Sequence, residues 1–220
     1  MRNFKRITLL CGHYGSGKTN VAVNLALHLR KTKDRVAVAD LDIVNPYFRT
    51  KDSRGAFEDA GIRLICSEYA NTNVDIPALP QDMYAVTDDR SLHAVIDVGG
   101  DDRGALALGR IVEPILAENN YEMLAVINSS RPLTHTPEDT VEVLREIEGA
   151  SGMKFTGLVN NTNLGRETDA DVVLKSVSYA ETVSNLMKIP LVMTTVPAEI
   201  FPQLERKIDN LFPLELQKKL

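Results

Sequence analysis

A glycine-rich segment near the start of the chain has the residue types and spacing that bind phosphate. Gly12-His13-Tyr14-Gly15-Ser16-Gly17-Lys18-Thr19 matches the pattern G-x-x-x-x-G-K-[ST], between an apolar run and an amphipathic stretch. The glycines allow the backbone to curl so that N–H groups point inward at phosphate oxygens, and the following helix N-terminus adds positive charge. Lys18 would reach the terminal phosphates, and the Thr19 hydroxyl would ligate Mg²⁺. The segment predicts a P-loop for a nucleoside triphosphate, ATP with Mg²⁺.

Two acids follow the next apolar run of the chain. Asp40 and Asp42 come directly after residues 36–39. The carboxyl ends of neighbouring parallel strands meet at one crevice, so these acids are expected beside the metal and the γ-phosphate. One of them would serve the metal and the other would orient the attacking water. The alternative is an ordinary turn, because Asp is common after strands.

A third motif, Asp97-Val98-Gly99-Gly100, closes another apolar run. It matches the D-x-x-G pattern of nucleotide switches. Asp97 would hold Mg²⁺, the Gly100 N–H would sense the γ-phosphate, and the loop that follows would move on hydrolysis. A strand-end Asp before glycines is otherwise ordinary turn chemistry.

The elements that position these motifs alternate along the whole chain. Several apolar runs are nearly continuous, which is typical of strands that are covered on both faces. The predicted strands span residues 7–11, 36–39, 62–66, 94–98, 121–128, 155–160 and 191–196. The predicted helices span residues 19–29, 104–118, 137–147 (with Thr136 as N-cap), 169–187 and 198–211. The pattern predicts one α/β domain over 1–220, a doubly wound, mostly parallel seven-stranded sheet with helices on both faces. Residues 71–80 are predicted to form a surface loop.

Composition narrows the class of protein. The hydrophobic fraction of 44% and the charged fraction of 25% are ordinary for a soluble domain, and the net charge of −5 gives no overall footprint for nucleic acid. No apolar stretch approaches the length of a membrane span. Cys11 and Cys66 lie far apart, with no spacing typical of a zinc site. The chain is therefore expected in the cytoplasm, without nucleic acid or membrane as partners.

Together, the three motifs resemble the CobQ/CobB/MinD/ParA nucleotide-binding family of P-loop ATPases, and the resemblance covers essentially the whole chain. In the MinD/ParA group the loop reads K-G-G-x-G-K-[ST], and its first lysine aligns with His13. In that group this lysine reaches across a dimer to the partner's nucleotide. Histidine is shorter and only partly charged at neutral pH. The resemblance therefore implies the fold and the nucleotide site, and leaves a nucleotide-dependent homodimer open.

The resemblance also implies roles for single residues. Asp42 matches the acid that positions the hydrolytic water, Asp40 an acid near the magnesium shell, and Asp101 the second acid of the nitrogenase-type D-x-x-G-D. Asn160 matches an Asn against the adenine edge, and Pro197 a turn that contacts the base; both could equally be turn residues. There is no N-K-x-D motif for guanine. The predicted catalytic residues are Lys18 and Asp42, and the predicted metal ligands are Thr19, Asp40 and Asp97. The predicted nucleotide contacts are Gly12, His13, Tyr14, Gly15, Ser16, Gly17, Lys18, Thr19, Asn20, Gly100, Asn160 and Pro197.

Three functions agree with these features. The first is an ATPase switch in which loops 40–52 and 97–105 engage a protein partner or cargo. The second is a biosynthetic synthetase that transfers the γ-phosphate to a carboxylate, a branch of the family that need not use the trans lysine. The third is a maturation factor for a metallocentre or a corrinoid protein.

Overall fold

The computed structural model describes residues 2–41, 54–66, 81–100, 104 and 108–215. They form an eight-stranded sheet in the order β3-β2-β4-β1-β5-β6-β7-β8, and every neighbouring pair is parallel. The strands are β1 (Ile7–Cys11), β2 (Val36–Leu41), β3 (Arg63–Ile65), β4 (His93–Val98), β5 (Tyr121–Ile127), β6 (Gly157–Asn160), β7 (Leu191–Pro197) and β8 (Leu211–Leu214).

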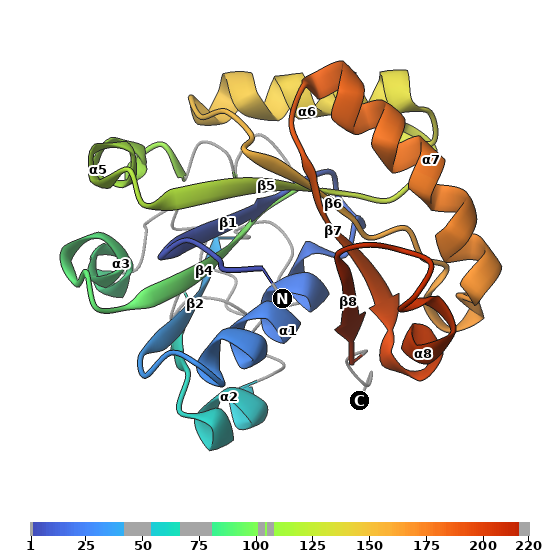
Figure 1. The fold of residues 1–220 in the computed structure, drawn as a ribbon. Helices are drawn as coiled ribbons and strands as arrows, with labels where there is room; N and C mark the ends of the chain where they lie inside the picture. The colour runs from blue at the N-terminus through green and yellow to red at the C-terminus, as the bar shows by residue number, and fades with distance from the viewer. Residues whose placement is uncertain (1, 42–53, 67–80, 101–103, 105–107, 216–220) are drawn as a thin grey trace, which may run out of the picture.

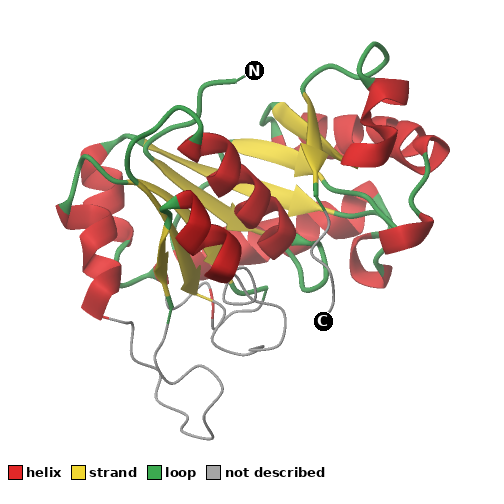
Figure 2. Ribbon diagram, turned by 90° about the horizontal axis from the view of Figure 1, so that it is seen from below, coloured by secondary structure: helices red, strands yellow, loops and turns green. Residues whose placement is uncertain are grey.

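Helices connect the strands and cover both faces of the sheet (Figure 1). The α-helices are α1 (Lys18–Arg30), α2 (Arg54–Ala60), α3 (Ala85–Asp88), α5 (Val112–Glu118), α6 (Pro137–Ser151), α7 (Ala170–Met187) and α8 (Phe201–Leu204). Single 3-10 turns are η2 (Gln81–Tyr84), η3 (Pro132–Thr134), η4 (Gly165–Glu167) and η5 (Ala198–Ile200). Figure 2 shows from a second direction that the helices flank the strands.

Alternate residues of the central strands belong to two separate apolar layers. Leu9 of β1 packs in the layer that receives α5, α6 and α7, whereas Leu10 packs in the layer that receives α1 and α2. All five residues of β1 are buried. A strand buried on both faces has no polar alternation, and the nearly continuous apolar runs reflect this.

The chain order brings the candidate site to the middle of one sheet edge. β1 lies between β4 and β5, and the connection through α1 passes over β4 to reach β2. The strands are in close register there, because Leu10 pairs with both Asp97 of β4 and Leu124 of β5. In open parallel sheets such a reversal of strand order leaves a crevice beyond the carboxyl ends of the strands. β1, β2 and β4 all end at that edge.

The predicted fold class is confirmed, and the strand count is corrected from seven to eight. The predicted helix over 198–211 was wrong. Only η5 and α8 form there, and residues 211–214 make β8, the last strand in the sheet order. Pro213 sits in this strand, which is tolerated because an edge strand can dispense with one N–H donor. The sequence analysis also missed α2, η2 and α3.

The other predicted elements differ mainly at their ends. The predicted span 104–118 contains α5, and part of that span lies outside the described residues, as does the predicted loop 71–80. The predicted cap of α6 forms, with Thr136 Oγ1 accepting a hydrogen bond of 3.2 Å from the Asp139 N–H. None of the helices in the described ranges has the length and apolar character needed to cross a bilayer.

Candidate nucleotide-binding site

The loop between β1 and α1 has a backbone that requires glycine at two positions. Gly12 has φ 154°, and a Cβ there would lie 2.2 Å from the carbonyl oxygen of Val126 in β5. Gly17 has φ 87°, and a Cβ there would lie 2.3 Å from Asn161 Nδ2. A side chain at either position would therefore collide with a neighbouring strand or its loop. The tight curl predicted for a P-loop thus depends on contacts with β5 and β6.

The start of α1 is built to receive an anion. Its N-cap is Gly17, which supplies no side-chain acceptor, and its first turn carries no acid. The N–H groups of the first turn and the positive end of the 13-residue helix are therefore available to a negative ligand. Ser16 Oγ is buried in the same loop and finds no hydrogen-bond partner among the described residues. Such a cradle suits the phosphates of a nucleotide.

Lys18 curls back over the loop from the first position of α1. Its Nζ donates to the carbonyl oxygens of Gly12 at 3.0 Å and His13 at 3.2 Å, and the residue is 7% exposed. Below it, burial raises the pKa of the Cys11 thiol to about 12, although the nearby Lys18 charge opposes the shift. Cys11 is therefore a packing residue behind the loop, and not a nucleophile.

Side-chain oxygens that could bind a metal lie together where β2, β4 and α1 converge. Thr19 Oγ1 donates to Asp97 Oδ2 at 2.6 Å, and Asp97 is buried. Asp40 pairs directly with Asp97 across β2 and β4, so both side chains project to the same face of the sheet. Hydroxyl and carboxylate oxygens are the ligands that Mg²⁺ prefers, and Mg²⁺ keeps several waters and substrate phosphates beside one or two carboxylates. Thr19, Asp40 and Asp97 therefore fit a magnesium ion that arrives with a nucleotide.

Within the described ranges, no group of three or more His, Cys, Asp and Glu side chains could hold a metal by itself. Two of the acids singled out from the sequence, Asp42 and Asp101, lie outside those ranges.

The end of β4 touches the phosphate loop. A Cβ on Gly100 would lie 2.7 Å from the Tyr14 backbone nitrogen and 3.0 Å from Lys18 Nζ. Only glycine lets the two backbones approach this closely. The segment after β4 therefore starts in contact with the loop and with its lysine.

Asn160 and Asn161, adjacent at the end of β6, point in different directions. Asn160 is fully buried; its Nδ2 donates to Ser176 Oγ of α7 at 2.8 Å, and its Oδ1 accepts from the Thr162 N–H. Asn161 Nδ2 instead donates to the Ser16 carbonyl oxygen at 2.6 Å, and Asn161 Oδ1 accepts from Thr195 Oγ1. Asn161, which the sequence analysis did not single out, therefore contacts the P-loop, and the predicted role of Asn160 at the adenine edge stays a prediction.

The remaining predicted contacts lie around the same edge. Asn20 is half-buried in the first turn of α1, and its carbonyl oxygen accepts from Asn24 Nδ2 at 2.9 Å. Pro197 is half-buried at the end of β7, directly before η5. Tyr14 is 59% exposed, and His13 Nδ1 lies 2.9 Å from the Tyr14 carbonyl oxygen.

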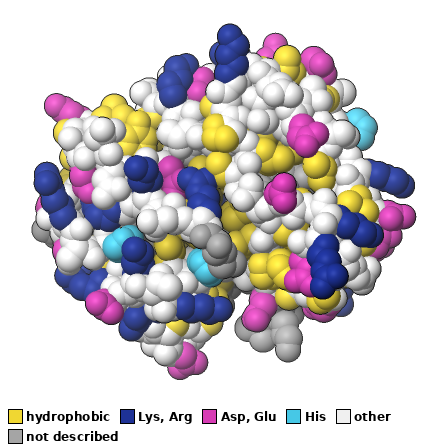
Figure 3. All heavy atoms as spheres, viewed as in Figure 1, with side chains coloured by type: hydrophobic (Ala, Val, Ile, Leu, Met, Phe, Trp, Pro, Cys, Tyr) yellow, Lys and Arg dark blue, Asp and Glu magenta, His cyan; other side chains and the backbone are white. Residues whose placement is uncertain are grey.

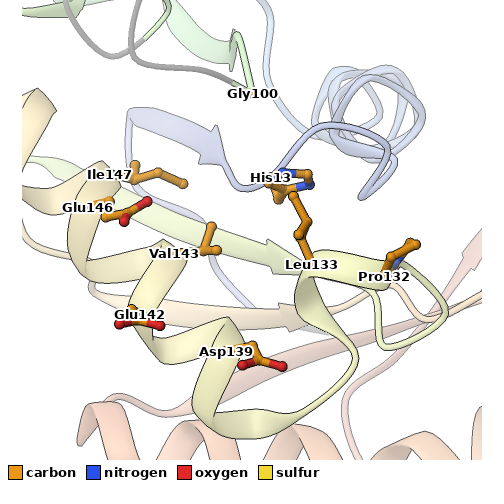
Figure 4. Close-up of a pocket in the computed structure, with 9 residues that line it drawn as sticks. All are labelled: His13, Gly100, Pro132, Leu133, Asp139, Glu142, Val143, Glu146 and Ile147. Atoms are coloured by element: carbon orange, nitrogen blue, oxygen red, sulfur yellow. The ribbon is translucent and has the colours of Figure 1, made fainter.

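A cavity of about 580 Å³ opens beside the loop, between His13 and Gly100 on one side and α6 on the other (Figure 4). Leu133, Val143 and Ile147 give it an apolar part. Asp139, Glu142 and Glu146 follow one another along α6 at helical spacing and give it a negative wall. The cavity therefore combines apolar and acidic surface next to two segments of the candidate site.

The sequence profile of the CobQ/CobB/MinD/ParA nucleotide binding domain (CbiA) matches residues 7–188. The chain belongs to this family. The match covers β1 to the end of α7, and thus the P-loop and Asp97. No curated protein sequence matches the chain significantly.

Solved structures share the fold of this CobQ/CobB/MinD/ParA domain at low sequence identity. The cell division protein FtsY of Thermotoga maritima is 17% identical, with a TM-score of 0.59 over 89% of this chain and 62% of that one. The signal recognition particle 54 kDa protein of Aeropyrum pernix K1, in complex with GDP, is 16% identical, with a TM-score of 0.55 over 88% of this chain and 42% of that one. The chain thus spans less than two thirds of these structures. The likeness shows a P-loop NTPase fold.

Two site residues escaped the sequence analysis. Asn161 was not distinguished from Asn160, because which of two adjacent residues faces the loop depends on the course of the strand end. Arg131, after β5, donates from Nε to the Gly15 carbonyl oxygen at 2.8 Å. Nothing in the sequence around Arg131 signals this contact, which joins residues 116 positions apart.

Proposed function

We propose that this chain is a Mg²⁺-dependent ATPase whose nucleotide state controls its interaction with a protein partner or cargo. Family membership supports nucleotide binding. The close approach of Gly100 to Tyr14 and to Lys18 Nζ carries the switch part of the proposal. A bound γ-phosphate would draw the Lys18 ammonium away from its two backbone acceptors, since a phosphate is the stronger acceptor. The Lys18 ammonium would then move away from Gly100 or back towards it with each round of hydrolysis.

A second connection joins the nucleotide to the same segment. Thr19 Oγ1 donates to Asp97 Oδ2, so the first turn of α1 is tied to β4 three residues before Gly100. Thr19, Asp40 and Asp97 would hold Mg²⁺, which supplies charge neutralisation between the β- and γ-phosphates. Ligation of the metal would use an oxygen lone pair of Thr19, so its hydroxyl can keep donating to Asp97 while it binds the metal. Both connections therefore link the phosphates and their metal to the end of β4.

We assign the water-orienting role to Asp42, because in the sequence it directly follows Leu41, the last residue of β2, and is two positions after Asp40. The protein would hold and orient the water through this carboxylate.

ATP is favoured over GTP by the loop after β6. Asn161 contacts the P-loop, and the position three residues later, where guanine-specific N-K-x-D loops carry an acid, is Leu164, which is 49% exposed. Guanine presents N1–H and N2–H donors side by side, which one carboxylate can accept together, whereas adenine carries N–H donors only on its N6 amino group. The GDP in the A. pernix structure makes GTP the necessary competitor in the test.

The cavity beside His13 favours a partner over a carboxylate substrate. Its acidic wall along α6 would repel the carboxylate that a synthetase of this family would phosphorylate. A positively charged or amphipathic protein segment would suit the same surface. On the face of the molecule shown in Figure 3, by contrast, acidic and basic side chains are interspersed.

Substitution of the P-loop lysine tests the catalytic part of the proposal. Lys18→Ala should abolish ATP turnover and weaken ATP binding by at least about tenfold, since a lost charge-assisted hydrogen bond is worth about 1.5–3 kcal/mol. Lys31→Ala, at the exposed C-terminal end of the same helix, is the matched control and should behave as wild type. Turnover that survives Lys18→Ala would refute the proposal. GTP preferred over ATP by more than tenfold would refute the base assignment.

The switch and the synthetase make opposite predictions about turnover. A switch hydrolyses ATP slowly by itself, whereas a synthetase needs an added metabolite and yields a phosphorylated product. Asp42→Ala should block turnover and trap the ATP state, whose solution mass can be compared with that of the ADP state. A doubling of mass with ATP alone would indicate a dimer despite His13; hydrolysis strictly dependent on a metabolite would overturn the switch.

A further inference from the structure

Arg131 reaches the P-loop from the turn that follows β5. Its Nε donates to the Gly15 carbonyl oxygen at 2.8 Å, and the atoms Nε, Cδ and Cζ lie 3.5–3.9 Å from the position of a Cβ on Gly15. The guanidinium is therefore in van der Waals contact with the loop, one peptide unit away from whatever the loop encloses.

The backbone that carries Arg131 is held firmly. The turn after β5 is organised around Asn128, which is fully buried. The carbonyl oxygen of Asn128 accepts from the Arg131 N–H at 3.2 Å and from Thr134 Oγ1 at 2.8 Å, and its Oδ1 accepts from the Ser130 N–H at 3.0 Å. A side chain that starts from a fixed turn and ends on a backbone acceptor loses little further entropy when it binds a ligand.

The side chain keeps most of its hydrogen-bonding capacity. A guanidinium has five N–H donors, and among the residues that the structure describes only the one on Nε has an acceptor. Across the described ranges Arg131 forms no ion pair. None of the described carboxylates therefore neutralises its charge, although it lies beside a loop that must bind several negative charges.

We propose that Arg131 is a nucleotide-binding residue that supplies positive charge to the bound phosphates from within the same chain. The Nε–H hydrogen bond holds the guanidinium at the Gly15 carbonyl oxygen. The remaining N–H donors and the positive charge bind the phosphates. Arginine suits this task because one edge of its planar fork can hold the loop while the other presents donors to an anion. The proposal rests on the proposed nucleotide binding and adds a second cation to Lys18.

Three substitutions separate charge from tethering. Arg131→Lys keeps the charge, Arg131→Gln keeps an amide donor for Gly15 without the charge, and Arg131→Ala keeps neither. Arg206→Ala, another exposed arginine far along the chain after α8, is the control. Affinity for MgATP and MgADP is measured by titration calorimetry at low and high NaCl, with urea unfolding to verify that each variant is folded.

Arg131→Ala and Arg131→Gln should weaken binding of both nucleotides by about tenfold to a hundredfold, the range for a lost charged hydrogen bond. Arg131→Lys should retain most of the affinity. The wild type should lose affinity with salt more steeply than Arg131→Gln, because screening acts on the charge. Wild-type affinity in Arg131→Ala, or full rescue by Gln, would overturn the proposal. Lys18→Ala tests the proposed nucleotide binding separately from the role of Arg131, since it should weaken nucleotide binding by at least about tenfold if the loop binds nucleotide, whatever Arg131 does.

Discussion

The two asparagines that end β6 provide the sharpest test of the site geometry. Asn160 and Asn161 are both buried, and each makes one hydrogen bond through Nδ2 and one through Oδ1. They differ in direction, because Asn160 binds Ser176 of α7 and Asn161 binds the Ser16 carbonyl oxygen in the P-loop. Replacement of each by alanine removes the same atoms from adjacent positions. We therefore expect similar losses of stability and different effects on nucleotide binding.

The size of the expected stability loss follows from the buried polar groups that each substitution leaves without a hydrogen-bond partner. Asn161→Ala leaves the Ser16 carbonyl oxygen and the Thr195 hydroxyl without their partners, at about 1–3 kcal/mol for each buried group. The Thr195 hydroxyl retains a longer contact of 3.4 Å to the Asn160 carbonyl oxygen, so its share lies at the low end. We expect Asn161→Ala to lower the free energy of unfolding by about 2–4 kcal/mol. Asn160→Ala should lie in the same range.

Nucleotide affinity separates the two variants. Without Asn161 the loop is no longer held at Ser16 before the phosphates arrive, and the cost of ordering it is taken from the binding free energy. We expect ATP and ADP to bind about tenfold more weakly to Asn161→Ala, which corresponds to about 1.4 kcal/mol. Asn160→Ala should bind within about twofold of wild type.

Urea unfolding gives the stabilities, and titration calorimetry on the folded proteins gives the affinities. The reasoning is refuted if Asn160→Ala loses affinity and Asn161→Ala does not. Asn160 would then contact the nucleotide, as the family resemblance implies.

Three further predictions follow from single contacts. Gly12→Ala should lower the free energy of unfolding by about 3 kcal/mol or more, because the added Cβ would lie 2.2 Å from the Val126 carbonyl oxygen. A loss below about 1 kcal/mol, measured by urea unfolding, would contradict the loop geometry. At pH 8 a thiol reagent should modify the half-buried Cys66 but not Cys11, because burial raises the pKa of the Cys11 thiol to about 12. The Cys66→Ser variant should therefore react only after denaturation. Labelling of the native variant would show that Cys11 is accessible. Burial lowers the pKa of His28 in the folded state, so the unfolded state binds the proton more readily and the free energy of unfolding should decline as pH falls through 6.5. The His28→Gln variant should flatten this decline between pH 7.5 and 5.5. An unchanged slope would exclude a role for His28.

The sequence by itself determined the class of fold and the chemistry of the loop. Continuous apolar runs favoured strands covered on both faces, and their alternation with amphipathic stretches indicated a parallel sheet. The pattern from Gly12 to Thr19 predicted a P-loop because phosphate binding needs curled glycine backbone, a lysine and a hydroxyl at fixed spacing. Asp97 could be placed near Thr19 because β4, which carries Asp97, and β1, whose loop leads to Thr19, end at one edge; the two side chains form a hydrogen bond of 2.6 Å.

Tertiary structure alone decided which side chains complete the site. Contact of Asn161 with Ser16, and of Asn160 with Ser176, depends on which way each side chain turns at the end of β6. The position of Arg131 depends on a turn built around the buried Asn128. The eighth strand was missed because residues 211–214 become a strand only by pairing with β7, and Pro213 argues locally against a strand. Local sequence encodes propensity and spacing. The partners that a folded chain brings to the P-loop from more than a hundred residues away are set by packing.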